Sequence, residues 1–169
     1  MSLFDGINLS LLFDNESEYG ESYTFGPLTD EMIERAEKKT GYKLPASYIE
    51  LLRFQNGGLI DDERLENSWL TAVYGIGETA DQSNSLEDMY DNWRYEWEYP
   101  DIGIPFGETQ SGGHDMYYMD FRSVDEKGEP RIVCIENEDD NAVYYIAHDL
   151  PEFIGMILRD EEIHGERIE

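Results

Sequence analysis

The chain has 169 residues, of which 40% are hydrophobic and 13% aromatic. This apolar content is too high for a disordered chain and suits a single domain with its own core. There are 12 basic and 39 acidic residues, a net charge of −27, which argues against direct binding to nucleic acid or to an anionic membrane. Two interpretations stay open: the charge serves solubility, or it attracts a basic partner.

Residues 1–27 are expected to form a docked apolar segment followed by an acidic loop. Three acids in this loop have the spacing of the first ligands of an EF-hand: Asp14, Glu16 and Glu18. The positions that require glycine and glutamate hold Tyr19 and Phe25 instead, which excludes a calcium loop. The N-terminus lacks the basic residues of a signal peptide, and no apolar run reaches the roughly 20 residues of a membrane span. We therefore expect a cytoplasmic protein.

The first predicted helix begins after Thr29 and ends before Gly41. The Thr29 hydroxyl can accept a hydrogen bond from an early backbone N–H, and glycine suits the left-handed turn that follows a helix. Lys38 and Lys39 lie at the end of the helix dipole that favours cations.

The second predicted helix has Pro45 at its first position and ends at Gly57 and Gly58. One face carries residues with the spacing i, i+3, i+4 and i+7, namely Tyr48, Leu51, Leu52 and Gln55. This pattern predicts that Leu51 lies in the core. At least one of the two glycines is expected to have a positive φ.

After this helix we expect an acidic loop, LIDDERLENS, and then a strand over residues 69–77. A third helix starts at Ser85 and stops at Pro100. Its helical phase predicts that Trp93 faces the core, whereas Tyr95 and Tyr99 lie at the surface.

The second half of the chain is rich in strands, predicted at 102–106, 115–121, 131–136 and 142–147. Pro105 suggests an edge strand or a strand end. The last two strands form a hairpin through NEDDN, and a closing helix follows with Asp149 as its cap. Short connections favour antiparallel pairing, so we predict a single α+β domain: one twisted, mostly antiparallel sheet with helices packed against it.

Two stretches resemble the SUKH superfamily: GYKLPASYIELLRFQNGG at 41–58 and YPDIGIPFGETQSGGHDMYYMDF at 99–121. The superfamily includes fungal regulators of cell-wall glucan synthesis and bacterial immunity proteins that neutralise toxins, often nucleases. The resemblance covers residues 28–158 and leaves 159–169 as a charged tail. It implies the same α+β fold and a protein-binding domain that is not an enzyme.

Motifs for catalysis or metal binding are weak. His114–Asp115 and His148–Asp149 lack the spacing of a zinc site, and roles in a turn and a helix cap explain them better. Cys134 lies in an alternating strand pattern without a basic neighbour that would activate a thiol. Carboxylate pairs arise by chance among 39 acids, so a hydrolase is only a third class of function. No metal or cofactor is expected.

The candidate partner-binding residues are two acidic runs and two aromatic residues: Asp61, Asp62 and Glu63; Glu136, Glu138, Asp139 and Asp140; Tyr95 and Tyr99. A solvated surface is the alternative for the acids. Acidic loops can steer a basic protein, and tyrosines can anchor it. We predict a monomer or weak homodimer that binds a basic protein, such as a cognate toxin. The alternative is a regulatory adaptor linked to cell-wall synthesis.

Overall fold

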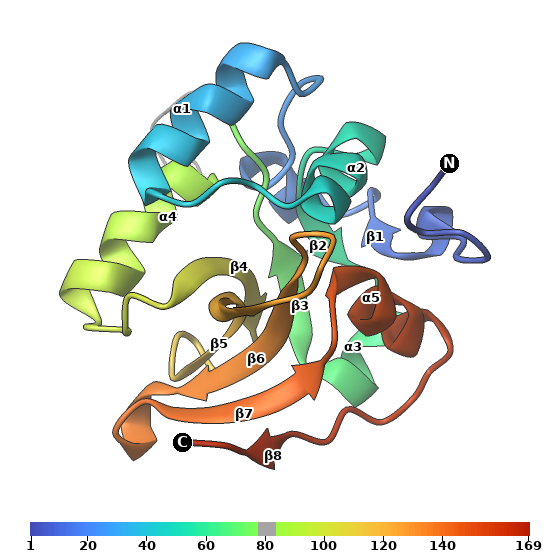
Figure 1. Cartoon of the computed structure of the whole chain (residues 1–169). Coiled ribbons are helices and arrows are strands. Elements are labelled where there is room, and N and C mark those ends of the chain that lie inside the picture. Colours follow the sequence, from blue (N-terminus) through green and yellow to red (C-terminus); the bar gives the residue numbers. More distant parts are fainter. Residues whose placement is uncertain (78–83) are drawn as a thin grey trace.

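The computed structural model describes residues 1–77 and 84–169, in which eight strands form one antiparallel sheet with the spatial order β1 to β8. The strands are β1 (Phe13–Asp14), β2 (Gly58–Ile60), β3 (Leu70–Val73), β4 (Gly103–Thr109), β5 (Asp115–Val124), β6 (Pro130–Glu136), β7 (Ala142–Ala147) and β8 (Glu166–Arg167). Each strand pairs with its neighbours in sequence, and Figure 1 shows the strong twist of the sheet. The predicted α+β fold is confirmed.

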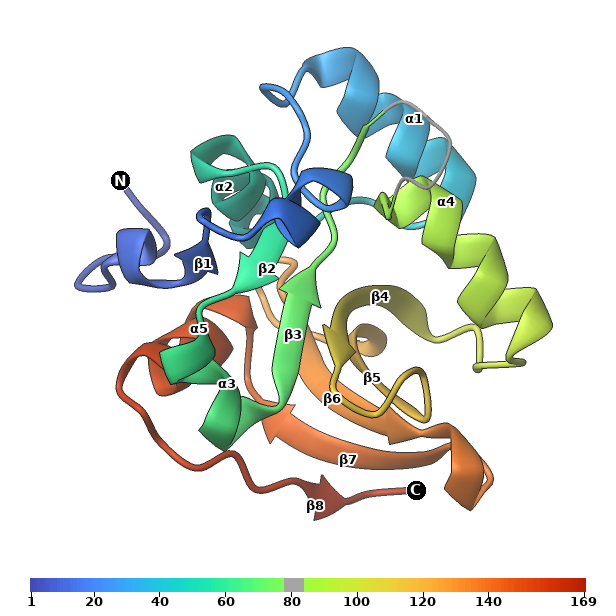
Figure 2. The same ribbon diagram turned by 180° about the vertical axis from the view of Figure 1, so that it is seen from behind.

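Within the same ranges there are five α-helices: α1 (Asp30–Thr40), α2 (Ala46–Phe54), α3 (Asp62–Ser68), α4 (Leu86–Asp91) and α5 (Leu150–Leu158). A π-helical turn, Asn92–Glu96, continues α4. Helix α5 packs on β6 and β7, whereas α1 and α4 lie side by side away from it (Figures 1 and 2). No helix in the described ranges is both long and apolar enough to span a membrane.

Local capping signals define the ends of α1 and α5. The Thr29 hydroxyl accepts from the Met32 N–H at 3.2 Å, and Gly41 ends α1 with φ +80°. Asp149 accepts from the Glu152 N–H at 2.9 Å at the start of α5. These three predictions are confirmed.

The start of α2 depends on a residue that is distant in sequence. Pro45 is the cap residue and not the first helical residue, so the predicted position was one residue off. Since proline has no side-chain acceptor, Glu129 fills this role: one carboxylate oxygen accepts from the Ser47 N–H at 3.0 Å, and the other accepts from the Ser47 hydroxyl. Glu129 is only 4% exposed and lies in the β5–β6 turn. The turn is thereby tied to α2.

The core lies between the sheet and the helices that cover it. Leu51 on α2 is fully buried, as predicted, and packs in a cluster with Tyr48, Phe106 and Phe153. Gly57 has φ +86°, and a Cβ there would lie 2.3 Å from the carbonyl oxygen of Tyr23. Only glycine fits this position without displacing the backbone.

The structure differs from the sequence prediction at three points. The stretch expected as an acidic loop contains α3, because Asp61 caps it and accepts from the Glu63 N–H at 2.9 Å. Pro105 lies in β4, an interior strand, at a register shift that accommodates its missing N–H. Strands β1 and β8 belong to the segments 1–27 and 159–169, outside the predicted domain, and pair with β2 and β7.

Candidate protein-binding site

We use the name acidic corner for the surface formed by Trp97, Glu98, His114 and residues 136–141. Three hydrogen bonds hold it together. The Asn137 side chain donates to the Trp97 carbonyl at 2.8 Å, and its backbone N–H donates to the His114 carbonyl at 2.8 Å. The Asn141 side chain donates to the Glu98 carbonyl at 3.1 Å. The β6–β7 turn is thus fixed against the chain that leaves α4, on the left of Figure 1.

An open depression of about 520 Å³ lies in this corner, lined by Ser111, His114, Asp115, Glu136, Glu138 and Asp139. Four of these six side chains are carboxylates. Glu138 approaches His114 Nδ1 at 3.0 Å, and Asp139 pairs with Arg167 at 3.0 Å. Both pairs are solvent-exposed and therefore weak. Neither pair therefore adds much stability at this surface.

The backbone of the acidic corner contains unusual conformations. Glu98, Asp140 and Asn141 have φ of +57°, +50° and +58°. Aspartate and asparagine tolerate the left-handed region, but glutamate adopts it at a cost of order 1–3 kcal/mol. Strained backbone of this kind is common at functional sites, where the surrounding contacts impose it.

The two candidate tyrosines have different environments. Tyr95 is 66% exposed, and the Arg94 guanidinium lies 5.4 Å from its ring centroid. Tyr99 is fully buried: its hydroxyl donates to the Gly113 carbonyl at 2.5 Å, and its ring stacks on Tyr118. The expectation that Tyr99 lies at the surface was therefore wrong. Burial also raises the pKa of the Tyr99 hydroxyl, with further contributions from Asp115 and Cys134.

The other acidic run, Asp61–Glu63, does not join the acidic corner. It forms the cap and first turn of α3, and Figures 1 and 2 place α3 well away from the β6–β7 turn. On α3, Arg64 pairs with Asp160 at 2.7 Å, which ties the helix to the segment after α5. The two acidic runs therefore present separate surfaces.

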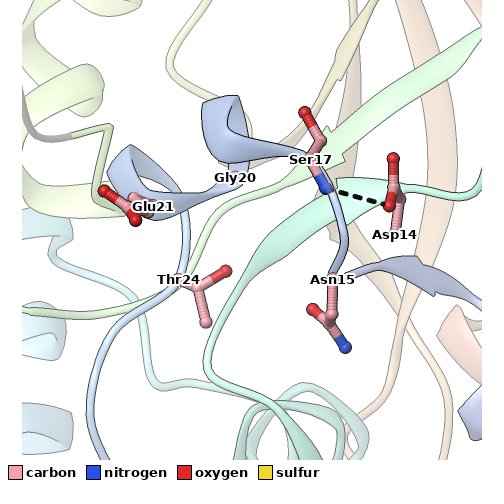
Figure 3. Close-up of a pocket in the computed structure, with 6 residues that line it drawn as sticks. All are labelled: Asp14, Asn15, Ser17, Gly20, Glu21 and Thr24. Atoms are coloured by element: carbon pink, nitrogen blue, oxygen red, sulfur yellow. Dashed lines mark hydrogen bonds between the residues drawn. The ribbon is translucent and has the colours of Figure 1, made fainter.

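Figure 3 shows a small hollow in the N-terminal segment, lined by Asp14, Asn15, Ser17, Gly20, Glu21 and Thr24. The Asp14 carboxylate accepts from the N–H groups of Glu16 and Ser17 at 2.9 and 3.3 Å. It therefore stabilises a local turn.

Sequence reasoning missed two features of the acidic corner. One is the contact of the Trp97 ring with His114, which it meets edge-on at a centroid distance of 5.7 Å. The other is the pair of hydrogen bonds from the Asn137 and Asn141 side chains. Both features depend on contacts between residues that are distant in sequence. Elsewhere, Cys134 lies on β6, and burial raises the pKa of its thiol, so it is a poor nucleophile.

The fold and surface together define an α+β domain that presents an acidic, structurally constrained corner. Residues 27–156 match the SMI1 / KNR4 family (SUKH-1), and the chain belongs to this family, in agreement with the predicted SUKH resemblance. The family is generally non-enzymatic. No curated protein matches the chain.

Proposed function

We propose that the protein is an immunity protein that neutralises a basic toxin by binding it through the acidic corner. The observation that carries this proposal is the depression in which carboxylates from β5, β6 and the β6–β7 turn converge. A lysine or arginine of the partner can enter this depression and displace the weak pairs of Glu138 and Asp139. The net charge of −27 would likewise attract a basic partner.

The chemistry of nuclease toxins matches this surface. A nuclease needs a basic cleft to hold phosphate, and an acidic protein surface can occupy such a cleft. Opposite charges over a wide area also raise the association rate. Trp97 belongs to the corner and Tyr95 lies two residues before it on the chain, so both can add apolar contacts, which usually determine the dissociation rate.

The decisive experiment uses the toxin encoded beside the gene in its source genome. Co-expression should restore growth of cells that produce this toxin, and the purified pair should associate rapidly at low salt. Asp139→Asn with Asp140→Asn should slow association about tenfold and reduce its salt dependence. Asparagine tolerates the left-handed backbone of position 140, so the turn should stay intact.

The matched control removes the same charge elsewhere. Glu31→Gln with Glu34→Gln changes two exposed acids on α1, which lies far from the β6–β7 turn in Figure 1. A pair on the second acidic run, Asp62→Asn with Glu63→Gln, tests α3. If the α1 pair slows association as much as the corner pair, the charge acts only globally. If only the α3 pair does so, the acidic corner is not the binding surface.

Tyr95→Ala tests the apolar contribution. We expect faster dissociation with little change in association, because an anchor acts after the encounter. An unchanged dissociation rate would remove Tyr95 from the interface.

The second candidate function, a regulatory adaptor in cell-wall synthesis, is favoured only by the family membership. Deletion of the gene separates the two functions. Loss of protection against a neighbouring toxin supports immunity, whereas altered wall composition in cells without that toxin supports regulation.

A further inference from the structure

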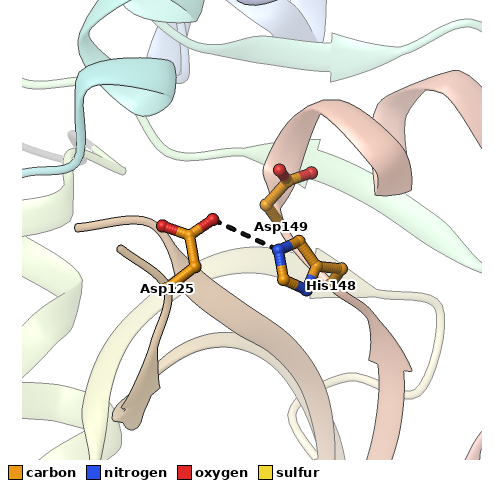
Figure 4. Close-up of side chains that lie close together, drawn as sticks. All are labelled: Asp125, His148 and Asp149. Atoms are coloured by element: carbon orange, nitrogen blue, oxygen red, sulfur yellow. Dashed lines mark hydrogen bonds and ion pairs between the residues drawn. The ribbon is translucent and has the colours of Figure 1, made fainter. Parts of the chain in front are cut away.

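At the opposite end of the sheet, Asp125, His148 and Asp149 converge, as Figure 4 shows. Asp125 comes from the β5–β6 turn, whereas His148 and Asp149 form the junction between β7 and α5. One donor atom from each side chain lies within 4.8 Å of the other two. The sequence favours a helix-cap role for His148–Asp149 over a metal role, because Asp125, the third residue of the cluster, is distant in sequence.

The backbone orients both carboxylates. Asp125 Oδ1 accepts from the N–H groups of Lys127 and Glu129 at 2.8 and 3.0 Å, while its Oδ2 lies 3.2 Å from His148 Nε2. Asp149 uses Oδ1 to cap α5 at Glu152. Each carboxylate therefore keeps a second oxygen for a ligand.

We propose that Asp125, His148 and Asp149 form a binding site for a divalent transition metal ion of the zinc class. Imidazole nitrogen and carboxylate oxygen are both common zinc ligands, at about 2.0–2.2 Å. Two ligands on one tetrahedral zinc lie about 3.3 Å apart. His148 Nε2 and Asp125 Oδ2, which are hydrogen-bonded at 3.2 Å, already have this separation, and an Asp149 oxygen lies within 4.8 Å of both. Three protein ligands leave one position open for water or a partner side chain.

The ion would join the β5–β6 turn to the junction between β7 and α5. Asp125 shares its turn with Glu129, which caps α2, and Asp149 caps α5. A metal bound between them fixes the β5–β6 turn where α2 and α5 approach the sheet. Because the ion binds the folded chain at this point, it should stabilise the native state.

The test titrates the untagged full-length protein with Zn²⁺, Co²⁺ and Mg²⁺ by calorimetry and thermal unfolding. Zn²⁺ at 100 times its Kd should raise Tm by about 5–10 °C. Co²⁺ should give an absorption spectrum typical of a four-coordinate site. Mg²⁺ should bind at least about tenfold more weakly, because imidazole favours transition metals. Equal binding of Mg²⁺ would overturn the proposal, since it would reflect only the acidic surface.

Three variants identify the ligands: His148→Gln and the isosteric changes Asp125→Asn and Asp149→Asn. The two asparagines keep the oxygen that accepts the backbone N–H groups, so the turn and the helix cap remain. Each variant should weaken Zn²⁺ binding about tenfold or more, with an unchanged circular dichroism spectrum. His114→Gln is the control, because His114 also lies beside carboxylates in the acidic corner. If this control abolishes binding and His148→Gln does not, the site is assigned wrongly.

Discussion

Replacing Asp120 by asparagine measures how much a buried carboxylate and its arginine partners contribute to the stability of the sheet. Asp120 is fully buried on β5, opposite Arg131 on β6. Its carboxylate accepts from the Arg122 backbone and side chain at 3.0 Å and from Arg131 Nε at 2.9 Å. The asparagine variant would turn an NH₂ group towards guanidinium donors.

Breaking a buried pair by removing one partner usually costs about 3–5 kcal/mol. The side chains of Arg122 and Arg131 are 36% and 25% exposed, so water can hydrate them in the variant. We therefore expect the low end, about 3 kcal/mol, and a fall in Tm of about 6–12 °C. Urea unfolding followed by tryptophan fluorescence measures this loss.

The pH dependence gives an independent check. Burial alone would raise the pKa of Asp120, but the hydrogen bonds from Arg122 and Arg131 outweigh it and lower the pKa. A lowered pKa stabilises the folded state above the unfolded value of about 3.9, and this contribution is lost as pH falls through the folded value. The stability difference between the wild type and Asp120→Asn should therefore shrink in acid.

The control for this prediction is Asp139→Asn, which removes one partner of the exposed pair with Arg167 and should cost less than about 1 kcal/mol. A loss below about 0.5 kcal/mol for Asp120→Asn, or a difference that stays constant in acid, would refute the reasoning.

Three further predictions concern the scaffold. Leu51→Ala should lower the free energy of unfolding, measured in urea, by about 2–5 kcal/mol, and a loss below about 0.5 kcal/mol would contradict the place of Leu51 in the core. Gly57→Ala should lower the free energy of unfolding more than Gly112→Ala does. Both glycines have positive φ, but of the two only Gly57 lacks room for a Cβ. Equal losses for the two variants would contradict this. Thermal unfolding should give coincident transitions by fluorescence and circular dichroism, whereas two separate transitions would exclude a single cooperative domain.

Sequence patterns that involve residues close together in the chain predicted the fold well. The Thr29 and Asp149 caps depend on bonds to residues three positions away, so the sequence alone is sufficient to locate them. The antiparallel pairing of β4, β5, β6 and β7 follows from the short connections between them. By contrast, the Glu129 cap of α2 and the pairing of β1 and β8 connect distant segments, for which a single sequence carries no local signal.

The error at Tyr99 has a specific cause. Tyr95 and Tyr99 are four residues apart and would share one face of a regular α-helix. The helix instead ends in a π-helical turn, and Glu98 then takes a left-handed conformation. The Tyr99 N–H donates to the Trp93 carbonyl, and its side chain enters the core. The helical phase was therefore correct up to Trp93 and wrong beyond the π-helical turn.

The same left-handed residues connect the fold to the proposed function. In the part of the chain that the structure describes, five non-glycine residues have positive φ, and Glu98, Asp140 and Asn141 belong to the acidic corner. Among these three, local preference opposes such a conformation most strongly at Glu98, so the contacts around it must supply the compensating stability. The asparagine bonds across the corner provide these contacts. The other two left-handed residues, Trp69 and Asp160, lie singly at the ends of α3 and α5. Departures from local preference are expected where a surface is under functional constraint. Three clustered left-handed residues favour the acidic corner as the proposed binding surface over the Asp61–Glu63 run, whose helix has a single one, Trp69, at its far end.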